Sequence, residues 1–213
     1  MTAFSDQLLA GHSDVWNEMQ QHPFVQAIEQ GTLPETAFHR YLVFEGEFVF
    51  SAVEILAQGL SHAPDVSRQR RLIQGLNGLV DTQLGWFERV MAKRGVVAEH
   101  WQPAPAGFIR FRDGMLQAAR TGGYADIMVL MFGAEWMYYH WCARAASRPQ
   151  HDEDLRDWLS MHADDAFYQQ ACWLKQEVDQ CGLTLSGQEK QRLSQLYGDV
   201  LAWEIDFHQA MLG

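Results

Sequence analysis

Three glutamates and one histidine stand where the helical repeat predicts buried apolar side chains: Glu45, Glu135, His162 and Glu204. Residues three or four apart share one face of an α-helix, so each of the four points the same way as its apolar neighbours. The apolar neighbours of Glu45, for example, are Phe38, Tyr41, Leu42, Phe48, Val49, Ala52, Val53 and Leu56. Burying an isolated charge costs several kcal/mol unless it is paired or neutralised. A polar pocket shared by the four side chains is the simplest explanation for all of them.

Carboxyl groups that share a poorly solvated site are suited to proton transfer. The charge of one carboxylate raises the pKa of another nearby, so one can act as a general acid and the other as a general base near neutral pH. Taken singly, each residue could instead be satisfied by a backbone carbonyl, an arginine or a tyrosine. Their joint occurrence on four segments is what favours a catalytic site.

Helices must carry these residues, because apolar spacing is helical almost throughout and no segment alternates as a strand does. Sequences typical of capping boxes predict helix starts at residues 32–35 and 186–189. Breaks in the helical pattern fall at residues 31, 63–64, 95–107, 122–123, 149 and 182. About seven helical segments lie between these breaks. No linker separates them, so we expect one all-α domain over residues 1–213.

The overall composition narrows the possible partners. With 47% hydrophobic residues in 213, the chain can bury one large core, and its formal charge of −11 disfavours nucleic acid and anionic membranes as partners. The apolar run at 127–134 is too short to cross a bilayer, and the N-terminus lacks signal-peptide features. Three cysteines without CxxC spacing are typical of a reducing compartment. We therefore expect a cytoplasmic protein without a disulfide framework or structural zinc.

One segment resembles a known family. Residues 22–42 read HPFVQAIEQGTLPETAFHRYL, and this stretch resembles the TenA, or thiaminase II-like, family, in which HPF precedes a G-x-L-x-x-x-x-F-x-x-Y-L helix. Weaker similarity continues at residues 136–141, 158–167 and 203–211, in the same order and spacing. The resemblance implies a haem-oxygenase-like bundle of helices that commonly assembles as a homotetramer. We accordingly expect a homotetramer or a homodimer.

The resemblance also assigns roles to several of the inward residues. Glu45 falls where the family usually has an aspartate that binds the pyrimidine ring of the substrate, and Phe48 falls where a tyrosine is usual. Glu204 matches a glutamate that acts as catalytic acid and base, and Phe207 matches an aromatic residue that packs against the pyrimidine. His162 replaces a tyrosine that lines the pocket.

The nucleophile is the main departure from the family pattern. Common family members carry Cys-x-x-x-Tyr where this chain runs from Glu135 to Tyr139. A register shifted by one instead pairs Ala134 with the cysteine and Tyr138 with the tyrosine, and both registers stay open. Neither supplies a thiol. A subgroup that lacks the cysteine and carries a pocket glutamate is associated with hydrolysis of amino- or formylaminopyrimidines that arise from thiamin breakdown.

The predicted chemistry is therefore attack of water on a pyrimidine without any cofactor or metal. We expect Glu204, Glu135 and Tyr139 to be catalytic. The substrate-binding residues are predicted to be Glu45, Phe48, Tyr138, His162 and Phe207. Cys142 lies two helical turns beyond Glu135, about 10 Å away, so we expect it to be buried packing rather than a nucleophile.

Two alternatives remain from the sequence. A non-haem metal-dependent oxidase on the same fold could draw its ligands from Asp81, Glu135, His162, Asp165 and Glu204. A pyrimidine-binding or regulatory relative without catalytic activity would also account for the missing cysteine and for phenylalanine at position 48. Metal analysis and an assay for released ammonia or formate separate these alternatives from the hydrolase.

Overall fold

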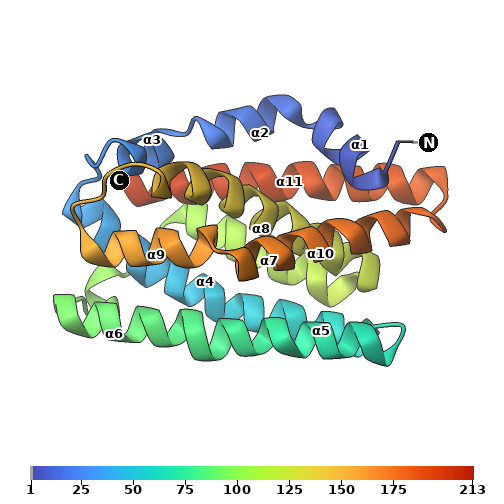
Figure 1. Cartoon of the computed structure of the whole chain (residues 1–213), viewed down its shortest axis with the longest axis horizontal. Helices are drawn as coiled ribbons and strands as arrows, with labels where there is room; N and C mark the ends of the chain where they lie inside the picture. The colour runs from blue at the N-terminus through green and yellow to red at the C-terminus, as the bar shows by residue number, and fades with distance from the viewer. Residues whose placement is uncertain (1) are drawn as a thin grey trace. The chain divides into compact units, whose positions relative to one another are not determined.

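A computed structural model of the chain describes residues 2–213, in which every regular element is helical (Figure 1). The elements are α1 (Phe4–Gly11), α2 (Ser13–Gln20), α3 (Pro23–Glu29), α4 (Glu35–His62), α5 (Val66–Asn77), η1 (Gly78–Leu84), α6 (Gly85–Arg94), η2 (Ala98–Trp101), α7 (Ala106–Thr121), α8 (Tyr124–Ala146), α9 (Glu153–Ala163), α10 (Asp165–Gly182) and α11 (Gly187–Leu212). The all-α fold class is therefore confirmed.

Some of these helices follow one another with little interruption. A π-helical stretch, η1, joins α5 to α6, and the three run in line in Figure 1. Asp164 alone separates α9 from α10, and His12 alone separates α1 from α2. Grouped by the breaks that the sequence predicted, the described helices fall into seven segments, some of them with shorter interruptions inside: α1–α3, α4, α5–α6, α7, α8, α9–α10 and α11.

The chain divides into two compact units. The first contains the described residues up to Thr32 together with Met128–Ile205, and the second contains Leu33–Ile127 together with Asp206–Gly213. Two of the three boundaries fall inside helices, so α8 and α11 each contribute residues to both units, and the third lies between α3 and α4. That residues 1–213 form a single domain stays a prediction.

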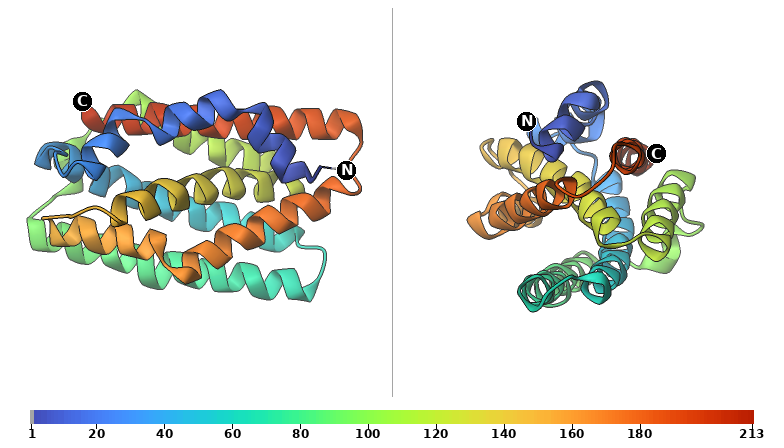
Figure 2. Two further views of the ribbon diagram at one scale, coloured as in Figure 1. Left: turned by 45° about the horizontal axis from the view of Figure 1, so that its top comes forward. Right: turned by 90° about the vertical axis from the view of Figure 1, so that its right-hand side faces the viewer.

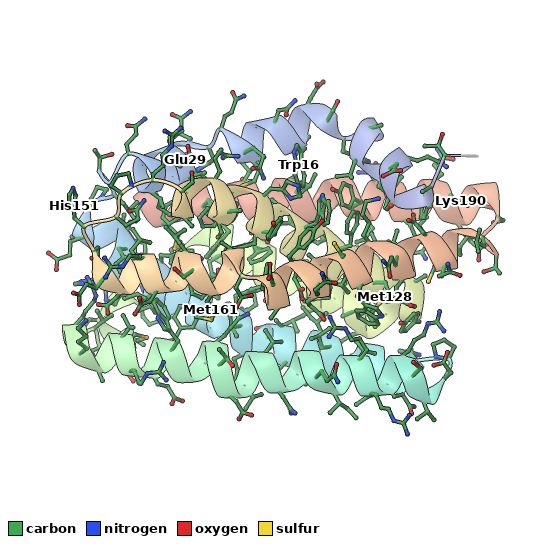
Figure 3. All side chains as sticks on the ribbon, viewed as in Figure 1. Trp16, Glu29, Met128, His151, Met161 and Lys190 are labelled. Carbon is green, nitrogen blue, oxygen red and sulfur yellow. The ribbon has the colours of Figure 1, made fainter. Side chains whose placement is uncertain are left out.

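Polar contacts hold the N-terminal helices in the first unit. The Ser5 N–H donates to Asp179 Oδ1 of α10 at 2.8 Å. The guanidinium of Arg144 on α8 donates to the carboxylate of Glu29 and to both the side-chain and backbone oxygens of Gln20. Figure 3 labels Glu29 at the end of α3. Arg144 thus ties α8 to the C-terminal ends of α2 and α3.

In the second unit, α4 packs against α7 and against the segment formed by α5, η1 and α6 (Figure 2). The rings of Phe44 and Phe108 lie 5.0 Å apart between centroids, and Arg112 Nη1 lies 2.9 Å from Glu47 Oε1. Aromatic contacts therefore fill the buried side of this helix pair, while ion pairs join its outer side.

The predicted capping boxes had different outcomes. At α11, the Glu189 N–H donates to Ser186 Oγ at 3.3 Å and the Ser186 N–H donates to Glu189 Oε2 at 2.8 Å, which confirms that box. The box at residues 32–35 is wrong, because the N-cap of α4 is Pro34 and the Thr32 hydroxyl donates to Ala27 O instead. A residue before proline is disfavoured in the helical region, so the helix begins after Pro34.

The helices described within residues 2–213 include none that is both long and apolar enough to cross a membrane.

Candidate active site

Glu204 is the most deeply buried of the predicted catalytic residues, with a side chain that is 0% exposed. It lies on α11 one turn after Val200, which packs closely on α8. A Cβ atom added to Gly133 of α8 would lie 2.9 Å from Val200 Cγ1, so only glycine allows the two helices to approach this closely. The close approach fixes the part of α11 that precedes Glu204.

His162 lies on α9 in an aromatic environment and is 3% exposed. The centroid of its ring is 3.7 Å from that of Trp158, 4.8 Å from that of Phe167 and 5.9 Å from that of Tyr138. Burial lowers the pKa of His162 to about 4, and its hydrogen bond with Trp158 O acts in the opposite direction. His162 is therefore a neutral imidazole at physiological pH.

The predicted residues on α8 occupy two different environments. Tyr138 is 6% exposed and lies beside His162, and Ala134 one turn earlier is also buried. Glu135 and Tyr139 are half-buried, and the ring of Tyr139 faces that of Tyr168 on α10 with centroids 4.7 Å apart. The structure thus brings Tyr138, but not Tyr139, into contact with His162.

The predicted residues of the second unit surround an aromatic cluster on α4, α7 and α11. The rings of Phe48 and Phe111 are 4.0 Å apart between centroids, and those of Phe111 and Phe207 are 5.3 Å apart. Glu45 lies one turn before Phe48 on α4 and is 4% exposed. Phe111 therefore brings Phe48 and Phe207 together.

Phe111 is the residue that sequence reasoning missed. Phe111 follows Phe108 by three residues in a helix that starts after Pro105, and this spacing marks an apolar stripe. The sequence could have revealed Phe111 through this spacing. That stripe carries no ionisable residue, so it did not stand out.

The remaining predictions differ in their outcome. Cys142 is buried, as expected for a packing residue. Among residues 2–213, no three His, Cys, Asp or Glu side chains gather closely enough to hold a metal ion, so the ligand set considered for a metal oxidase gains no support. That Glu45, Glu135, His162 and Glu204 line one shared pocket stays a prediction.

Known proteins resemble this chain along most of its length. An aminopyrimidine aminohydrolase of Halalkalibacterium halodurans is 24% identical over 201 residues, which cover 92% of this chain and 89% of the relative. An aminopyrimidine aminohydrolase of Bacillus subtilis is 22% identical over 171 residues, which cover 78% of this chain and 72% of the relative.

A solved structure shows the same fold. The structure of a TenA homologue from Pyrococcus furiosus matches with a TM-score of 0.90 at 16% identity, covering 98% of this chain and 99% of the other. In addition, the family model described as the TENA/THI-4/PQQC family matches residues 9–213. That match extends over nearly the whole sequence, and it shows that the chain belongs to the TENA/THI-4/PQQC family.

Proposed function

We propose that this protein is an aminopyrimidine aminohydrolase that acts on products of thiamin breakdown. Water replaces the exocyclic amino group of a pyrimidine, and the products are a hydroxypyrimidine and ammonia. The names of the relatives from Halalkalibacterium halodurans and Bacillus subtilis support this reaction, as does membership of the family. The main structural observation behind the proposal is that the carboxyl group of Glu204 is completely buried.

Glu204 serves as the general base and then as the general acid. Its carboxylate takes a proton from water as the water oxygen forms a bond to the ring carbon that bears the amino group. The same carboxyl group then returns the proton to the departing nitrogen as the carbon–nitrogen bond breaks, which balances the reaction without a redox step. A positioned carboxyl group of this kind contributes about 10²- to 10⁴-fold to a rate.

We propose the register that pairs Ala134 with the cysteine of the common family members and Tyr138 with their tyrosine. The burial of Ala134 and Tyr138 supports it, together with the contact between Tyr138 and His162. Tyr138 then takes the hydrogen-bonding role that the other register gives to Tyr139. Glu135 orients the attacking water from its half-buried position.

The substrate-binding residues of the second unit divide into one polar and several apolar groups. Glu45 holds the amino group of the substrate, since a carboxylate accepts hydrogen bonds from an N–H. Phe48 and Phe207, with Phe111 between them, offer aromatic surface to a flat pyrimidine ring.

Ammonia release tests the proposed function. The parent protein is incubated with 4-aminopyrimidines and their N-formyl derivatives, and ammonia, formate and the pyrimidine product are quantified together. We expect equal amounts of ammonia and hydroxypyrimidine, with activity unchanged by a chelator. Saturable binding without product would overturn the proposal in favour of a binding protein, and loss of activity on chelation would favour a metal enzyme.

Glu204→Gln is the matched test of the mechanism. An amide of the same shape keeps part of the hydrogen bonding but exchanges no proton, so we expect kcat to fall by about 10²- to 10⁴-fold. Glu189→Gln is the control, because Glu189 belongs to the exposed capping box of α11. Circular dichroism checks that both variants keep the fold. A Glu204→Gln enzyme with parental kcat would show that the assigned role is wrong.

We also propose that the protein is a cytoplasmic homo-oligomer whose copies meet on the outer face of α4 and α7. The three free cysteines support the location. Phe50 of α4 is 71% exposed, an unusual state for a large aromatic side chain. On α7, Leu116 lies one turn from each of two arginines, Arg112 and Arg120.

Charge supports a second copy of the chain as the occupant of this face. Arg112 pairs with Glu47 at 2.9 Å and Arg120 pairs with Glu54 at 2.6 Å, on either side of Phe50 in sequence. Asp113 also pairs with Arg112, so the acidic side chains of this face are paired with arginines on a chain whose net charge is −11, and two copies repel each other less here than elsewhere. A twofold axis near Phe50 would place each ion pair opposite the other pair of the partner, as an isologous interface requires.

A further inference from the structure

The tautomer of His162 is fixed by a hydrogen bond within α9. His162 Nδ1 lies 3.0 Å from the carbonyl oxygen of Trp158, four residues earlier in the helix. A carbonyl oxygen can only accept a hydrogen bond, so the proton of this bond is carried by Nδ1. Because burial lowers the pKa of the ring to about 4, there is no second proton at neutral pH. Nε2 therefore carries a lone pair.

The ring is also held in one orientation. The rings of Trp158, Phe167 and Tyr138 pack against it, and the bond to Trp158 O is the one hydrogen bond that it makes among residues 2–213. A flip of the imidazole would place a carbon at Trp158 O and lose that bond. The side chain is 3% exposed, and its one hydrogen bond uses Nδ1, so Nε2 can accept a hydrogen bond from a ligand.

We infer that His162 Nε2 is a fixed hydrogen-bond acceptor that selects ligands with an N–H donor, such as the amino group of an aminopyrimidine. The inference rests on the proposed function and names the chemical feature that the site requires of its substrate. A tyrosine, which the family resemblance implies at this position, could donate or accept. This histidine can only accept, since its one proton is committed to Trp158 O.

The fixed acceptor distinguishes the substrate from the product. Hydrolysis replaces the amino group by a hydroxyl group, and in the oxo form of the product that oxygen is an acceptor. Two acceptors that face each other share no hydrogen bond, so an oxopyrimidine bound in the orientation of the aminopyrimidine, with its oxygen in place of the amino group, leaves Nε2 without a partner. We expect the oxo form to bind about 10-fold or more weakly than the aminopyrimidine, because an unpaired buried polar group is costly.

NMR of the parent protein tests the tautomer without reference to catalysis. Long-range nitrogen–proton spectra of protein labelled with ¹⁵N at its nine histidines report which ring nitrogens carry protons. A His162→Gln difference spectrum assigns the signals of this ring. At pH 7 we expect a protonated Nδ1 and an unprotonated Nε2. A ring that carries its proton on Nε2, or that averages between both forms, would overturn the inference.

Ligand titration then tests the selection. Glu204→Gln protein, which is expected to turn the substrate over about 10²- to 10⁴-fold more slowly than the parent, is titrated with 4-aminopyrimidine, with 4-pyrimidinone and with unsubstituted pyrimidine. We expect the ¹⁵N resonance of Nε2 to shift on binding of 4-aminopyrimidine and to stay unchanged with the other two. In His162→Gln, whose amide can accept and donate, we expect the preference for the amino compound over the oxo compound to shrink.

The outcomes separate the inference from the proposed function. If the parent releases ammonia but saturating 4-aminopyrimidine leaves Nε2 unchanged, the function stands and the inference fails. If Nε2 responds to the amino compound alone while no aminopyrimidine is hydrolysed, the inference stands and the function fails. Where His162→Gln folds poorly, a His162→Asn difference spectrum assigns the same signals, and the parent's response to 4-aminopyrimidine then decides the matter.

Discussion

The phenol ring of Tyr138 on α8 lies against the imidazole of His162 on α9, with 5.9 Å between ring centroids. Tyr139, the next residue along, instead faces Tyr168 on α10. A step of one residue turns the side chain by about 100° around a helix, so the two tyrosines cannot share one environment. This difference decides which tyrosine we expect to matter for catalysis.

Removing the hydroxyl group of each tyrosine compares the two directly. We expect Tyr138→Phe to lower kcat/KM by about 10-fold or more, because a buried hydrogen bond to the substrate is lost. Tyr139→Phe should stay within about twofold of the parent. Steady-state ammonia release measures both. The reverse ranking would favour the register that pairs Glu135 with the cysteine.

His162 makes stability depend on pH in a defined direction. Its pKa is lowered to about 4 in the folded protein, against an ordinary value of 6.5, so the unfolded chain binds the proton more readily. The contribution of neutral His162 is therefore fully present above about pH 6.5 and is lost as pH falls toward 4. The loss is on the order of 3 kcal/mol, at about 1.4 kcal/mol for each pH unit of pKa shift.

Urea unfolding of the parent and of His162→Gln between pH 7.5 and about pH 4.5 measures this effect. The pKa values of His22 and His140 are also lowered by burial, so the difference between parent and variant is the quantity to follow. We expect the parent's advantage in unfolding free energy to shrink as the pH falls. A difference that stays constant across the range would mean that burial does not shift His162.

Phe111 should be a major source of stability in the second unit. It is fully buried between the rings of Phe48 and Phe207. Phe111→Ala would leave a cavity and is expected to cost about 3–5 kcal/mol of unfolding free energy, measured by denaturant titration. Leu183→Ala is the control, because Leu183 is 77% exposed and lies outside the proposed contact between copies, which predicts a change within about 0.5 kcal/mol. Equal losses for the two variants would contradict the described burial.

Phe50→Asp should break the proposed contact between copies. A carboxylate on each side of a twofold axis introduces like-charge repulsion and removes the apolar anchor. We expect sedimentation velocity to show a smaller assembly than the parent forms. Leu183→Asp is the control, because Leu183 is an exposed apolar residue on the other unit. A monomeric parent, or a Phe50→Asp protein that assembles like the parent, would refute the proposal.

Periodicity along the chain was enough to predict the fold class and the burial of three ionisable residues. Glu45, His162 and Glu204 all lie within the buried class, as their apolar stripes indicated. The capping box of α11 could also be predicted from the sequence, since a cap depends on residues within one turn of each other. The capping box expected at the start of α4 was wrong, because the helix begins after Pro34 and Thr32 lies outside it.

The sequence by itself determined that the chain is helical and which helix faces are apolar, because a helix places every third or fourth residue on one side whatever its neighbours are. Only the tertiary structure decided that Tyr138, rather than Tyr139, meets His162 and that Phe111 joins Phe48 to Phe207. Several positions on a helix are apolar enough to be buried, so the packing of the other helices decides which of these side chains meet. That packing depends on contacts between residues far apart in the chain, which local spacing does not encode.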